Sequence, residues 1–494
     1  MRQEQRELQN VHPPDWRNPE PIGRYNMVII GAGPAGMLTA MTAARMGAKV
    51  ALIERNRFGG VWFNVGCISS KAIIRTSRLY AEMRNAEAFG AQVPTDISVA
   101  FPAVMERMRR VRAGISRRFS AQRLSSMGVD VYFGAARFAG PDAIEVEGKR
   151  LRFKRALVAS GARPKLPSIP GIAAAGYLTN ENVFELAECP RRLLVLGGGP
   201  LACELAQAFC RLGSQVSIVQ NDPMFLGNEE RDAAQILSDA LARDGIDIHL
   251  STDTINVRTE GNQKVVDLVR DDCKSTLTVD EIGIGIGRVP NVEGMNLEAA
   301  GVQYDKEVGI LTNDYLQTSN PRIYAAGDVC SEKIFPHIEA AAADLVVRNA
   351  LFWGRERLSA LAIPWCTYTD PEIAHVGLYV TEARAKGIPV KTFTVMMHDV
   401  DRAITDGEDE GFVKIHVKEG TDKILGATVA ASHAGEMISE ISLAMNAGIG
   451  LSALARVNHP YPTQAQAIKM AADAYLATRH TPTRKWLHKQ WLSH

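Results

Sequence analysis

The chain has 494 residues, which at roughly 100–200 residues per domain suggests about three domains. Its formal net charge is +1, so no overall electrostatic field favours binding to nucleic acid or to a membrane surface. No apolar run approaches the ~20 residues that a membrane-spanning helix needs, and the polar N-terminus lacks the apolar stretch of a signal peptide.

The first 24 residues contain four prolines, at positions 13, 14, 19 and 21. Proline has no amide hydrogen and fixes one backbone angle, so it interrupts regular structure. We therefore expect residues 1–24 to form an N-terminal tail without regular structure.

A strand–helix–strand unit follows the tail. Apolar residues 25–30 predict a strand, the segment 31–36 (Gly-Ala-Gly-Pro-Ala-Gly) a glycine turn, and the pattern beyond it a helix to about Met46. A second apolar run, 49–53, ends in Glu54. This order is typical of the first half of a dinucleotide-binding domain.

The glycines of this unit have separate tasks. Gly31 allows the tight turn, Gly33 lets the backbone approach a pyrophosphate, and Gly36 lets helix and strand pack closely. The helix N-terminus then points at the phosphates. Glu54 follows Gly33 at about the 20-residue distance at which an acid accepts hydrogen bonds from a ribose.

The pattern returns at Gly197, far enough along the chain to place the second unit in another domain. A strand at 191–196 leads into Gly197-Gly-Gly199-Pro-Leu-Ala202, and the next strand ends at Gln220. An acid at that position would favour NADH and a nearby arginine NADPH. Gln220 is neither, so the choice between NADH and NADPH stays open.

After about residue 363 the chain loses this glycine pattern. Residues 413–417 and 424–430 look like strands, and the stretch 435–448, rich in Ala, Met and Ile, looks like a helix. The pattern predicts an α+β domain.

Five segments, in this order along the chain, resemble motifs of the pyridine nucleotide–disulfide oxidoreductases. The sequence most resembles the mercuric reductase and dihydrolipoamide dehydrogenase branch of that family. Residues 59–71 (Gly-Gly-Val-Trp-Phe-Asn-Val-Gly-Cys-Ile-Ser-Ser-Lys) resemble the active-site helix. Residues 287–291 resemble the end of the nucleotide domain, and 319–329 the second FAD motif. Residues 370–377 resemble the opening of the dimerisation domain, and 459–463 the C-terminal active-site motif.

The resemblance implies an α/β protein with two Rossmann-like domains, for FAD and NAD(P), and a C-terminal α+β dimerisation domain. The expected boundaries are 1–24 for the tail, 25–172 and 295–362 for the FAD domain, 173–294 for the NAD(P) domain, 363–480 for dimerisation, and 481–494 for a basic aromatic tail. The expected cofactors are FAD and NAD(P)H, and the expected assembly is a homodimer in which one subunit's C-terminal motif completes the other's active site.

The expected catalytic residues are Cys67, Trp62, Lys71, Glu204 and Tyr461. The expected cofactor-binding residues are Gly31, Gly33, Pro34, Ala35, Gly36, Glu54, Arg55, Gly60, Lys71, Gly134, Ala135, Ser160, Gly161, Gly197, Gly199, Ala202, Gln220, Gly287, Arg288, Gly327 and Asp328. By resemblance, Lys71 approaches the flavin and pairs with Glu204; the alternative is an ordinary interdomain salt bridge.

The sequence departs from the family at its chemical centre. The family's redox pair is Cys-x-x-x-x-Cys, but here Trp62 takes the place of the substrate-facing cysteine and Cys67 remains. Tyr461 stands at the family's histidine base, as in mercuric reductases, and Gln466 replaces the acid that supports it. The chain also ends without the paired cysteines that deliver mercury.

One thiol cannot store two electrons in an internal disulfide. We therefore expect electrons to pass from reduced FAD directly to a small acceptor such as a quinone. One alternative is a reductase of peroxide or a low-molecular-weight disulfide that works through Cys67 alone. Another is a catalytically retired flavoprotein that serves as a scaffold or sensor.

Cys67 and Trp62 each keep more than one interpretation. Cys67 is a thiolate partner of the flavin, a reactive centre or a packed relic, and Trp62 is a plug or a face on which an aromatic acceptor stacks. Tyr461 could donate a hydrogen bond to an acceptor, because a phenol with a pKa of about 10 is a poor base. His459 is expected to be structural.

The remaining expectations concern surroundings. Seven scattered cysteines are not a secreted disulfide framework and indicate a reducing cytoplasm. No histidine spacing suggests a metal, so none is proposed. The tail 484–492, with Trp486 and Trp491, could contact a membrane surface, pack on the dimer or be disordered.

Overall fold

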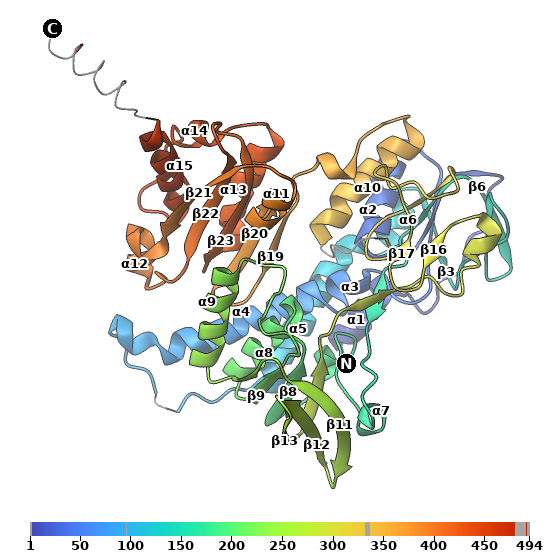
Figure 1. Cartoon of the computed structure of the whole chain (residues 1–494). Helices are drawn as coiled ribbons and strands as arrows, with labels where there is room; N and C mark the ends of the chain where they lie inside the picture. The colour runs from blue at the N-terminus through green and yellow to red at the C-terminus, as the bar shows by residue number, and fades with distance from the viewer. Residues whose placement is uncertain (1, 95, 331–335, 480–490, 492–494) are drawn as a thin grey trace. The chain divides into compact units, whose positions relative to one another are not determined.

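The computed structural model describes residues 2–94, 96–330, 336–479 and 491. They belong to two compact units, which we describe separately (Figure 1). Unit 1 is the described part of Met1–Gly197, Ala208–Asn221 and Thr252–Ala360, and unit 2 that of Gly198–Gln207, Asp222–Ser251 and Leu361–His494. Within the described residues, no helix combines the length and the apolar character needed to cross a bilayer.

A mixed sheet forms the centre of unit 1, in the order β3-β2-β1-β6-β5-β4, with β18 also beside β6. Its parallel strands are β1 (Tyr25–Ile30), β2 (Val50–Glu54), β3 (Val129–Phe133), β6 (Lys149–Val158) and β18 (Ile323–Ala325). β4 (Arg137–Phe138) and β5 (Ala143–Val146) extend it antiparallel.

Apolar side chains cover both faces of this sheet, because successive residues of a strand point to opposite sides. In β2, Val50 and Leu52 join one buried core, while Ala51 and Ile53 join the other. A sheet buried on both faces explains why the strands read as continuous apolar runs in the sequence.

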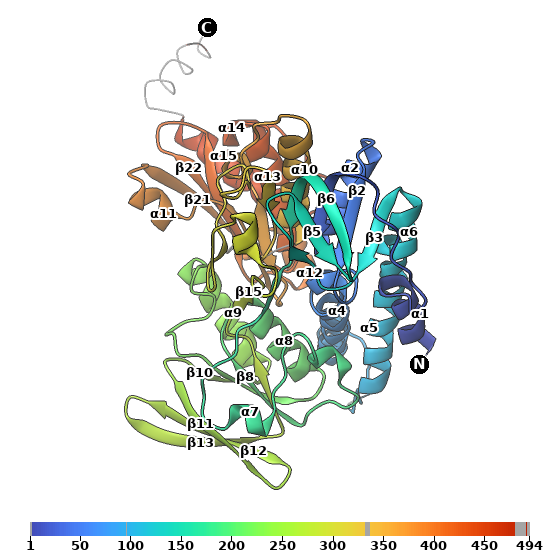
Figure 2. The same ribbon diagram turned by 90° about the vertical axis from the view of Figure 1, so that its right-hand side faces the viewer.

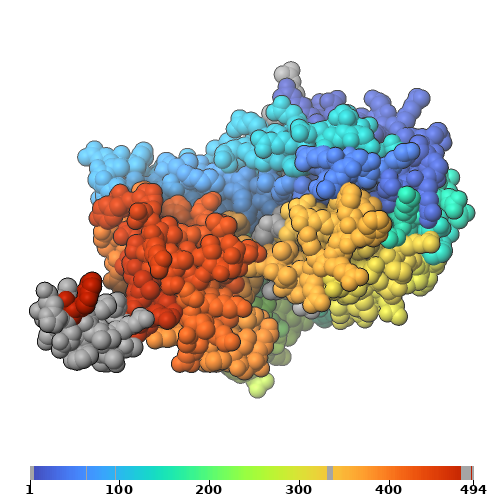
Figure 3. Space-filling model, turned by 90° about the horizontal axis from the view of Figure 1, so that it is seen from above, coloured from blue at the N-terminus to red at the C-terminus, as the bar shows by residue number. Residues whose placement is uncertain are grey.

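Helices pack over the first of these cores. They are α1 (Arg2–Val11), α2 (Pro34–Arg45), α3 (Gly60–Phe63), α4 (Cys67–Arg84), α6 (Ala121–Ser126) and α10 (Pro336–Leu351). Helix α5 (Phe101–Ser116) packs against α1 and α4. The yellow-orange surface of α10 borders the blue surface of α2 in the space-filling view (Figure 3), and the two helices are in contact.

Helix α1 corrects the expectation that the first 24 residues lack regular structure. The four prolines all follow α1, so they do not prevent it. Glu7 forms a buried ion pair with Arg112 at 2.8 Å, and Val11 is fully buried, with its carbonyl accepting from the Phe58 amide at 3.0 Å. His12 then stacks on Phe133 with 4.3 Å between ring centroids. The segment is therefore part of the core of unit 1.

The second nucleotide domain contributes a parallel sheet to unit 1, with β9 (Gln215–Val219), β8 (Arg192–Leu196) and β14 (Glu281–Ile284) in that order. Beside it lies an antiparallel sheet of β11 (Asp253–Glu260), β12 (Gln263–Arg270) and β13 (Cys273–Val279), next to α7 (Ile172–Ala175) (Figure 2). β7 (Ala162–Pro164) and β15 (Arg288–Pro290) form a two-stranded connection.

Unit 2 contains the predicted C-terminal α+β domain. Its five strands pair antiparallel in the order β19 (Pro364–Thr367), β20 (Glu372–Gly377), β23 (Ile424–Ala431), β22 (Phe412–Lys418) and β21 (Val390–Met396). The helices include α9 (Arg231–Arg243), α11 (Val380–Ala385), α12 (Asp401–Asp406), α13 (Ala434–Asn446), α14 (Leu451–Leu454) and α15 (Gln466–Thr478). The two strands and the helix expected at 413–448 are confirmed as β22, β23 and α13.

Candidate active site

The first glycine cradle has the geometry that a pyrophosphate requires. Gly31 has a φ of +101°, and a Cβ there would lie 2.2 Å from the carbonyl oxygen of Ala159. A Cβ on Gly36 would lie 1.9 Å from the Gly31 carbonyl oxygen. A Cβ on Gly33 would meet nothing within 4 Å. The protein itself therefore does not require glycine at Gly33, whose open surroundings at the start of α2 fit the phosphates of FAD.

Glu54, the last residue of β2, lies beside this cradle. Its carboxyl group accepts hydrogen bonds from the amides of Ala32 and Asn56, each at 2.8 Å. Burial raises the pKa of Glu54, and these two hydrogen bonds oppose the rise. A carboxylate offers about four acceptor sites, so the group keeps capacity for a ribose hydroxyl. The exposed Arg55 follows directly.

Other expected FAD residues follow the carboxyl ends of β3 and β6 in the same sheet, the edge at which such folds bind ligands. Gly134, ahead of Ala135, follows β3, and its amide donates to the Glu54 carbonyl at 2.9 Å. Ser160 follows β6, and its hydroxyl donates to the Asn291 carbonyl at 2.8 Å. Gly161 has a φ of +70°, which favours glycine.

Asp328 and Arg288 form a buried ion pair on the same side of unit 1. An Asp328 oxygen lies 2.8 Å from an Arg288 nitrogen. Asp328 directly follows Gly327 in the chain, and Gly327 has a φ of +82°. Burial raises the pKa of Asp328, and the Arg288 charge opposes the rise. The other carboxyl oxygen, Oδ1, is buried without a hydrogen-bond partner among the described residues. An acceptor left in this way suits a hydroxyl of the ribityl chain of FAD.

Glu339 on α10 joins this site, although the sequence reasoning missed it. Its Oε2 accepts from the Ala35 amide, inside the first turn of α2, at 3.1 Å. Burial and the neighbouring Asp328 raise the pKa of Glu339 to about 8. No local pattern in the sequence indicates this contact, because Ala35 and Glu339 are 304 residues apart in the chain.

Cys67 is the first residue of α4. Gly66 precedes it, and a Cβ there would lie 2.4 Å from the carbonyl oxygen of Val61 in α3, so the tight link between the two helices needs glycine. The positive end of a helix dipole stabilises a thiolate at such a position. Lys71 follows four residues later, one helical turn on.

Trp62, in α3, packs within unit 1. Its ring lies 4.6 Å from that of Phe119, with the planes tilted by 55°. The indole is half-buried and also packs against the core that α2 and α10 share. This packed position is compatible with both roles expected for Trp62, a plug in the substrate pocket and a surface on which an aromatic acceptor stacks.

The second cradle begins as expected after β8. Gly197 has a φ of +108°, and a Cβ there would lie 2.5 Å from the Gly285 carbonyl oxygen. β9 ends at Val219, and Gln220 follows it. Gly199 and the buried Ala202 belong to unit 2, whereas Gly197 belongs to unit 1, so this site stays a prediction from the sequence.

The pairing of Lys71 with Glu204 also stays a prediction, because the two residues belong to different units. Glu204 is buried in unit 2, and its carboxyl oxygen accepts from the Tyr368 amide at 2.9 Å. Gly287, at the end of the nucleotide domain, has a φ of +108° with open space around it, which leaves room for a ligand.

The C-terminal motif lies in unit 2 with two acidic partners that the sequence reasoning missed. The hydroxyl of Tyr461, 72% exposed, donates to Asp401 at 2.8 Å, and this hydrogen bond raises the pKa of Tyr461. Nε2 of His459 lies 3.0 Å from a Glu440 oxygen on α13. The tyrosine is thus a hydrogen-bond donor at neutral pH, and Gln466 begins α15.

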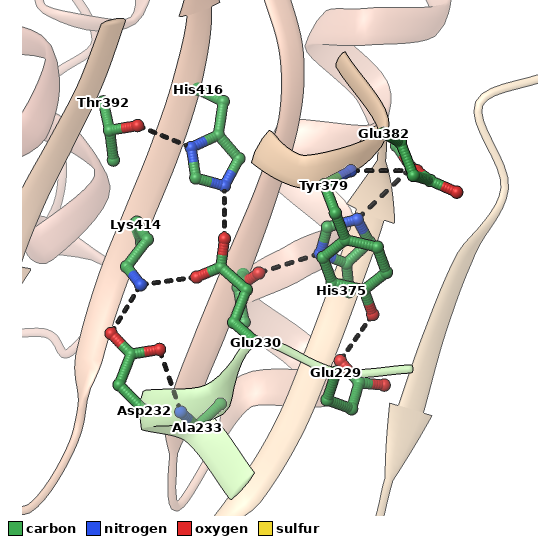
Figure 4. A network of polar contacts seen from close by, with 12 residues as sticks. Glu229, Glu230, Asp232, Ala233, His375, Tyr379, Glu382, Thr392, Lys414 and His416 are labelled. Carbon is green, nitrogen blue, oxygen red and sulfur yellow. Dashed lines mark hydrogen bonds and ion pairs between the residues drawn. The ribbon is translucent and has the colours of Figure 1, made fainter. Parts of the chain in front are cut away.

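A network of polar groups, with the buried His416 among them, lies elsewhere in unit 2 (Figure 4). Glu230 lies 3.0 Å from His416, and Lys414 binds both Glu230 and Asp232. Burial alone would raise the pKa of Glu230, but hydrogen bonds from His416 and Lys414 lower it to about 2. Its neighbour Glu229 accepts hydrogen bonds from Trp365 and Tyr379. The network joins the start of α9 to the five-stranded sheet.

Comparison with known proteins places these features in a family. Residues 25–344 match the family model for pyridine nucleotide-disulphide oxidoreductases, and residues 363–472 match the dimerisation domain of the same family. The mercuric reductase of Staphylococcus aureus is 33% identical over 454 residues, which cover 91% of this chain and 82% of that protein. A dihydrolipoyl dehydrogenase of Thermus scotoductus is 32% identical over 462 residues, covering 91% and 97%.

Solved structures agree with the sequence matches. The HOCl-induced flavoprotein disulfide reductase RclA from Escherichia coli has a TM-score of 0.80 and 27% identity, covering 91% of this chain and 99% of that one. LpdA from Mycobacterium tuberculosis has a TM-score of 0.83 and 27% identity, covering 92% and 100%. The chain therefore belongs to the pyridine nucleotide-disulphide oxidoreductase family, and it is an FAD-dependent oxidoreductase that uses NAD(P)H and carries the family's dimerisation domain.

Proposed function

We propose that this enzyme passes electrons from NAD(P)H through FAD to a small acceptor such as a quinone, without a dithiol relay. The observation that carries the proposal is Trp62, which stands five residues before Cys67 where the family's motif has its first redox cysteine. A dithiol stores two electrons by breaking one disulfide bond. Cys67 alone cannot do so.

None of the other six cysteines stands at the position of the missing one in the sequence motif. The structure describes all seven cysteines, and no two of them are joined by a disulfide. Cys330 lies two residues after Asp328, which is one of the expected FAD-binding residues. Burial raises the pKa of Cys330 to about 12, so this thiol is not a thiolate nucleophile at neutral pH.

The chain's own residues would support direct transfer. FAD, when bound, supplies the redox chemistry between nicotinamide and acceptor. The Lys71 ammonium would stabilise negative charge at the flavin. The Tyr461 hydroxyl would turn its one hydrogen from Asp401 to a bound acceptor. Trp62 would fill the space in which a disulfide substrate docks in the family, or present its face to an aromatic acceptor.

Anaerobic titration with NADH and with NADPH tests the first half of the proposal. At least one nucleotide should bleach the flavin absorbance, and the comparison of the two gives the preference that Gln220 leaves open. Reoxidation by a panel of quinones, peroxides and low-molecular-weight disulfides then identifies the acceptor class. The proposal fails if neither nucleotide bleaches the flavin, or if quinones do not reoxidise it.

The variant Cys67→Ser separates direct transfer from the single-cysteine alternative. Quinone reduction should stay within a few-fold of the wild-type rate, whereas a peroxide or disulfide reductase that forms a mixed species through Cys67 would lose turnover. The position of Cys67 at the start of α4, which favours a thiolate, is what keeps that alternative in view. Cys273→Ser, an exposed cysteine on β13, is the matched control.

Restoring the family's motif gives a converse test. Trp62→Cys should allow a disulfide with Cys67, so complete anaerobic reduction would consume two additional electrons per subunit. Loss of thiol titre on mild oxidation would report the same bond. If each subunit of the unmodified protein already consumes four electrons, two more than its flavin can accept, a second redox centre exists and the proposed direct route is wrong.

The dimerisation domain supports a homodimer, which we propose as the active form, with each C-terminal motif completing the partner's site. A cytoplasmic location stays a prediction from the scattered cysteines. The expected membrane contact of the tail 481–494 lies outside the described residues, apart from the exposed Trp491.

A further inference from the structure

Glu339 holds one of the backbone donors on which a pyrophosphate would depend. Its Oε2 accepts from the Ala35 amide at 3.1 Å, and Ala35 is the second residue of α2, directly after Gly33 and Pro34. The first amides of a helix have no partner within the helix and are the groups that bind phosphate. A carboxylate of the protein thus competes for a phosphate donor of the cradle.

Three other described groups that can carry charge face Glu339. The charge of Asp328 raises the pKa of Glu339, and Arg288 lies 2.8 Å from Asp328. The partly buried Cys330 lies near both carboxyl groups, whose charges raise the pKa of its thiol. Glu339 also reaches Gly327, where a Cβ would lie 3.4 Å from its Cδ. The unpartnered Oδ1 of Asp328 is buried in the same place, so the cluster contains an acceptor that the protein does not satisfy.

The charges of this cluster balance only if the two carboxyl groups share one proton. In that state Asp328 and Glu339 carry a single negative charge, which Arg288 neutralises. The raised pKa of Glu339, about 8, has this origin: burial and the adjacent Asp328 disfavour a second negative charge. A bound pyrophosphate adds two negative charges beside the same amide.

We propose that Glu339 is a cofactor-positioning residue whose carboxyl group must be protonated, and must release the Ala35 amide, when FAD binds. A protonated Glu339 can donate a hydrogen bond towards the phosphates, whereas an ionised one repels them and keeps the amide for itself. FAD binding therefore takes up a proton at alkaline pH. The inference rests on the FAD dependence of the family and is independent of the acceptor.

The dissociation constant of FAD tests the proposal without any measurement of turnover. Holoprotein is diluted at a series of pH values between 6.5 and 9.5, and released FAD is measured by its fluorescence and by filtration. Affinity should be constant below about pH 7 and should then weaken by about tenfold per pH unit above about pH 8, as linkage to one proton requires.

The variant Glu339→Gln keeps the shape of the side chain but cannot ionise. Its dissociation constant should be flat across the range and at least about tenfold lower than that of the wild type at pH 9. Asp344→Asn, an exposed acid on the same helix, is the control and should retain the wild-type profile. Circular dichroism at each pH separates loss of FAD from unfolding.

Two results would overturn the proposal. One is a wild-type affinity that does not change between pH 7 and 9.5. The other is a Glu339→Gln profile that weakens in parallel with the wild type, which would assign the dependence to another group. Neither outcome bears on the proposed electron acceptor, because that proposal is tested by bleaching and reoxidation at neutral pH.

Discussion

Trp62 and Phe119 pack with their ring centroids 4.6 Å apart and their planes tilted by 55°. Trp62 therefore has a structural partner in the position where the family's motif has a reactive thiol. An indole held in this way cannot be replaced without a packing cost, so the departure from the family's redox pair is built into the surrounding side chains.

The energy of this contact can be measured with a double-mutant cycle. Trp62→Ala should lower the free energy of unfolding by about 2 kcal/mol, below the usual cost for a fully buried tryptophan, because the ring is only half-buried. Trp62→Ala and Phe119→Ala together should cost about 0.5–1.5 kcal/mol less than the sum of the single changes. Urea denaturation measures both, with the 93% exposed Trp353→Ala as control. Strict additivity would show that the two rings do not interact.

The two glycines Gly33 and Gly36 should separate cofactor binding from folding. Gly33→Ala places a methyl group where nothing lies within 4 Å, so stability without FAD should change by less than about 0.5 kcal/mol while FAD affinity falls at least tenfold. Gly36→Ala places it 1.9 Å from a carbonyl oxygen and should destabilise the fold by about 1–3 kcal/mol or more. Retained FAD and urea midpoints give the two readouts. A Gly33→Ala protein that keeps normal FAD affinity would contradict the placement of the phosphates.

The buried pair of Glu7 and Arg112 should anchor α1. Glu7→Ala leaves the Arg112 charge without its carboxylate, although a hydrogen bond from Arg112 to the Asn64 carbonyl remains, so we expect a loss of about 3 kcal/mol in the free energy of unfolding. The exposed pair of Arg75 and Glu82, at 3.4 Å, supplies the control: Glu82→Ala should cost less than about 1 kcal/mol. Equal losses in the two variants would mean that α1 is not held by this ion pair.

The network around Glu230 (Figure 4) should give unit 2 a characteristic response to acid. The folded-state pKa of about 2 lies below the ordinary value of 4.5, so the stabilisation is complete above about pH 4.5 and is lost as the pH falls towards 2. Glu230→Gln should therefore be less stable than the wild type at pH 6, and this difference should shrink at lower pH. Urea midpoints between pH 6 and pH 3 measure it, with the exposed Glu260→Gln as control. A difference that is constant with pH would contradict the ion pairs of Glu230 with His416 and Lys414.

The sequence predicted what depends on neighbours along the chain. The glycine cradle at 31–36, the acid at the end of β2 and the strand ending before Gln220 all follow from local spacing, and the structure has them as expected. The C-terminal strands β22 and β23 were readable because their apolar runs are bounded by turns.

The sequence could not predict contacts between distant segments. Glu339 reaches Ala35 across 304 residues, and Asp401 reaches Tyr461 across 60. An acid on a helix gives no sign in the sequence of which partner it will meet, since only folding brings the two together. Helix α1 was missed for another reason. The prolines interrupt regular structure only from residue 13 onwards, so they do not affect residues 2–11, which form the helix.

The burial of α1 has a consequence for how the family's architecture is extended in this chain. The family match begins at residue 25, yet the fully buried Val11 contributes to the core that α2 and α10 share, and Trp16 donates to the Val131 carbonyl at 3.1 Å. A protein cut at Tyr25 would expose that core. The residues that precede the matched domain are thus part of the packed wall of the FAD fold, and a substitution in them also affects the residues that they cover.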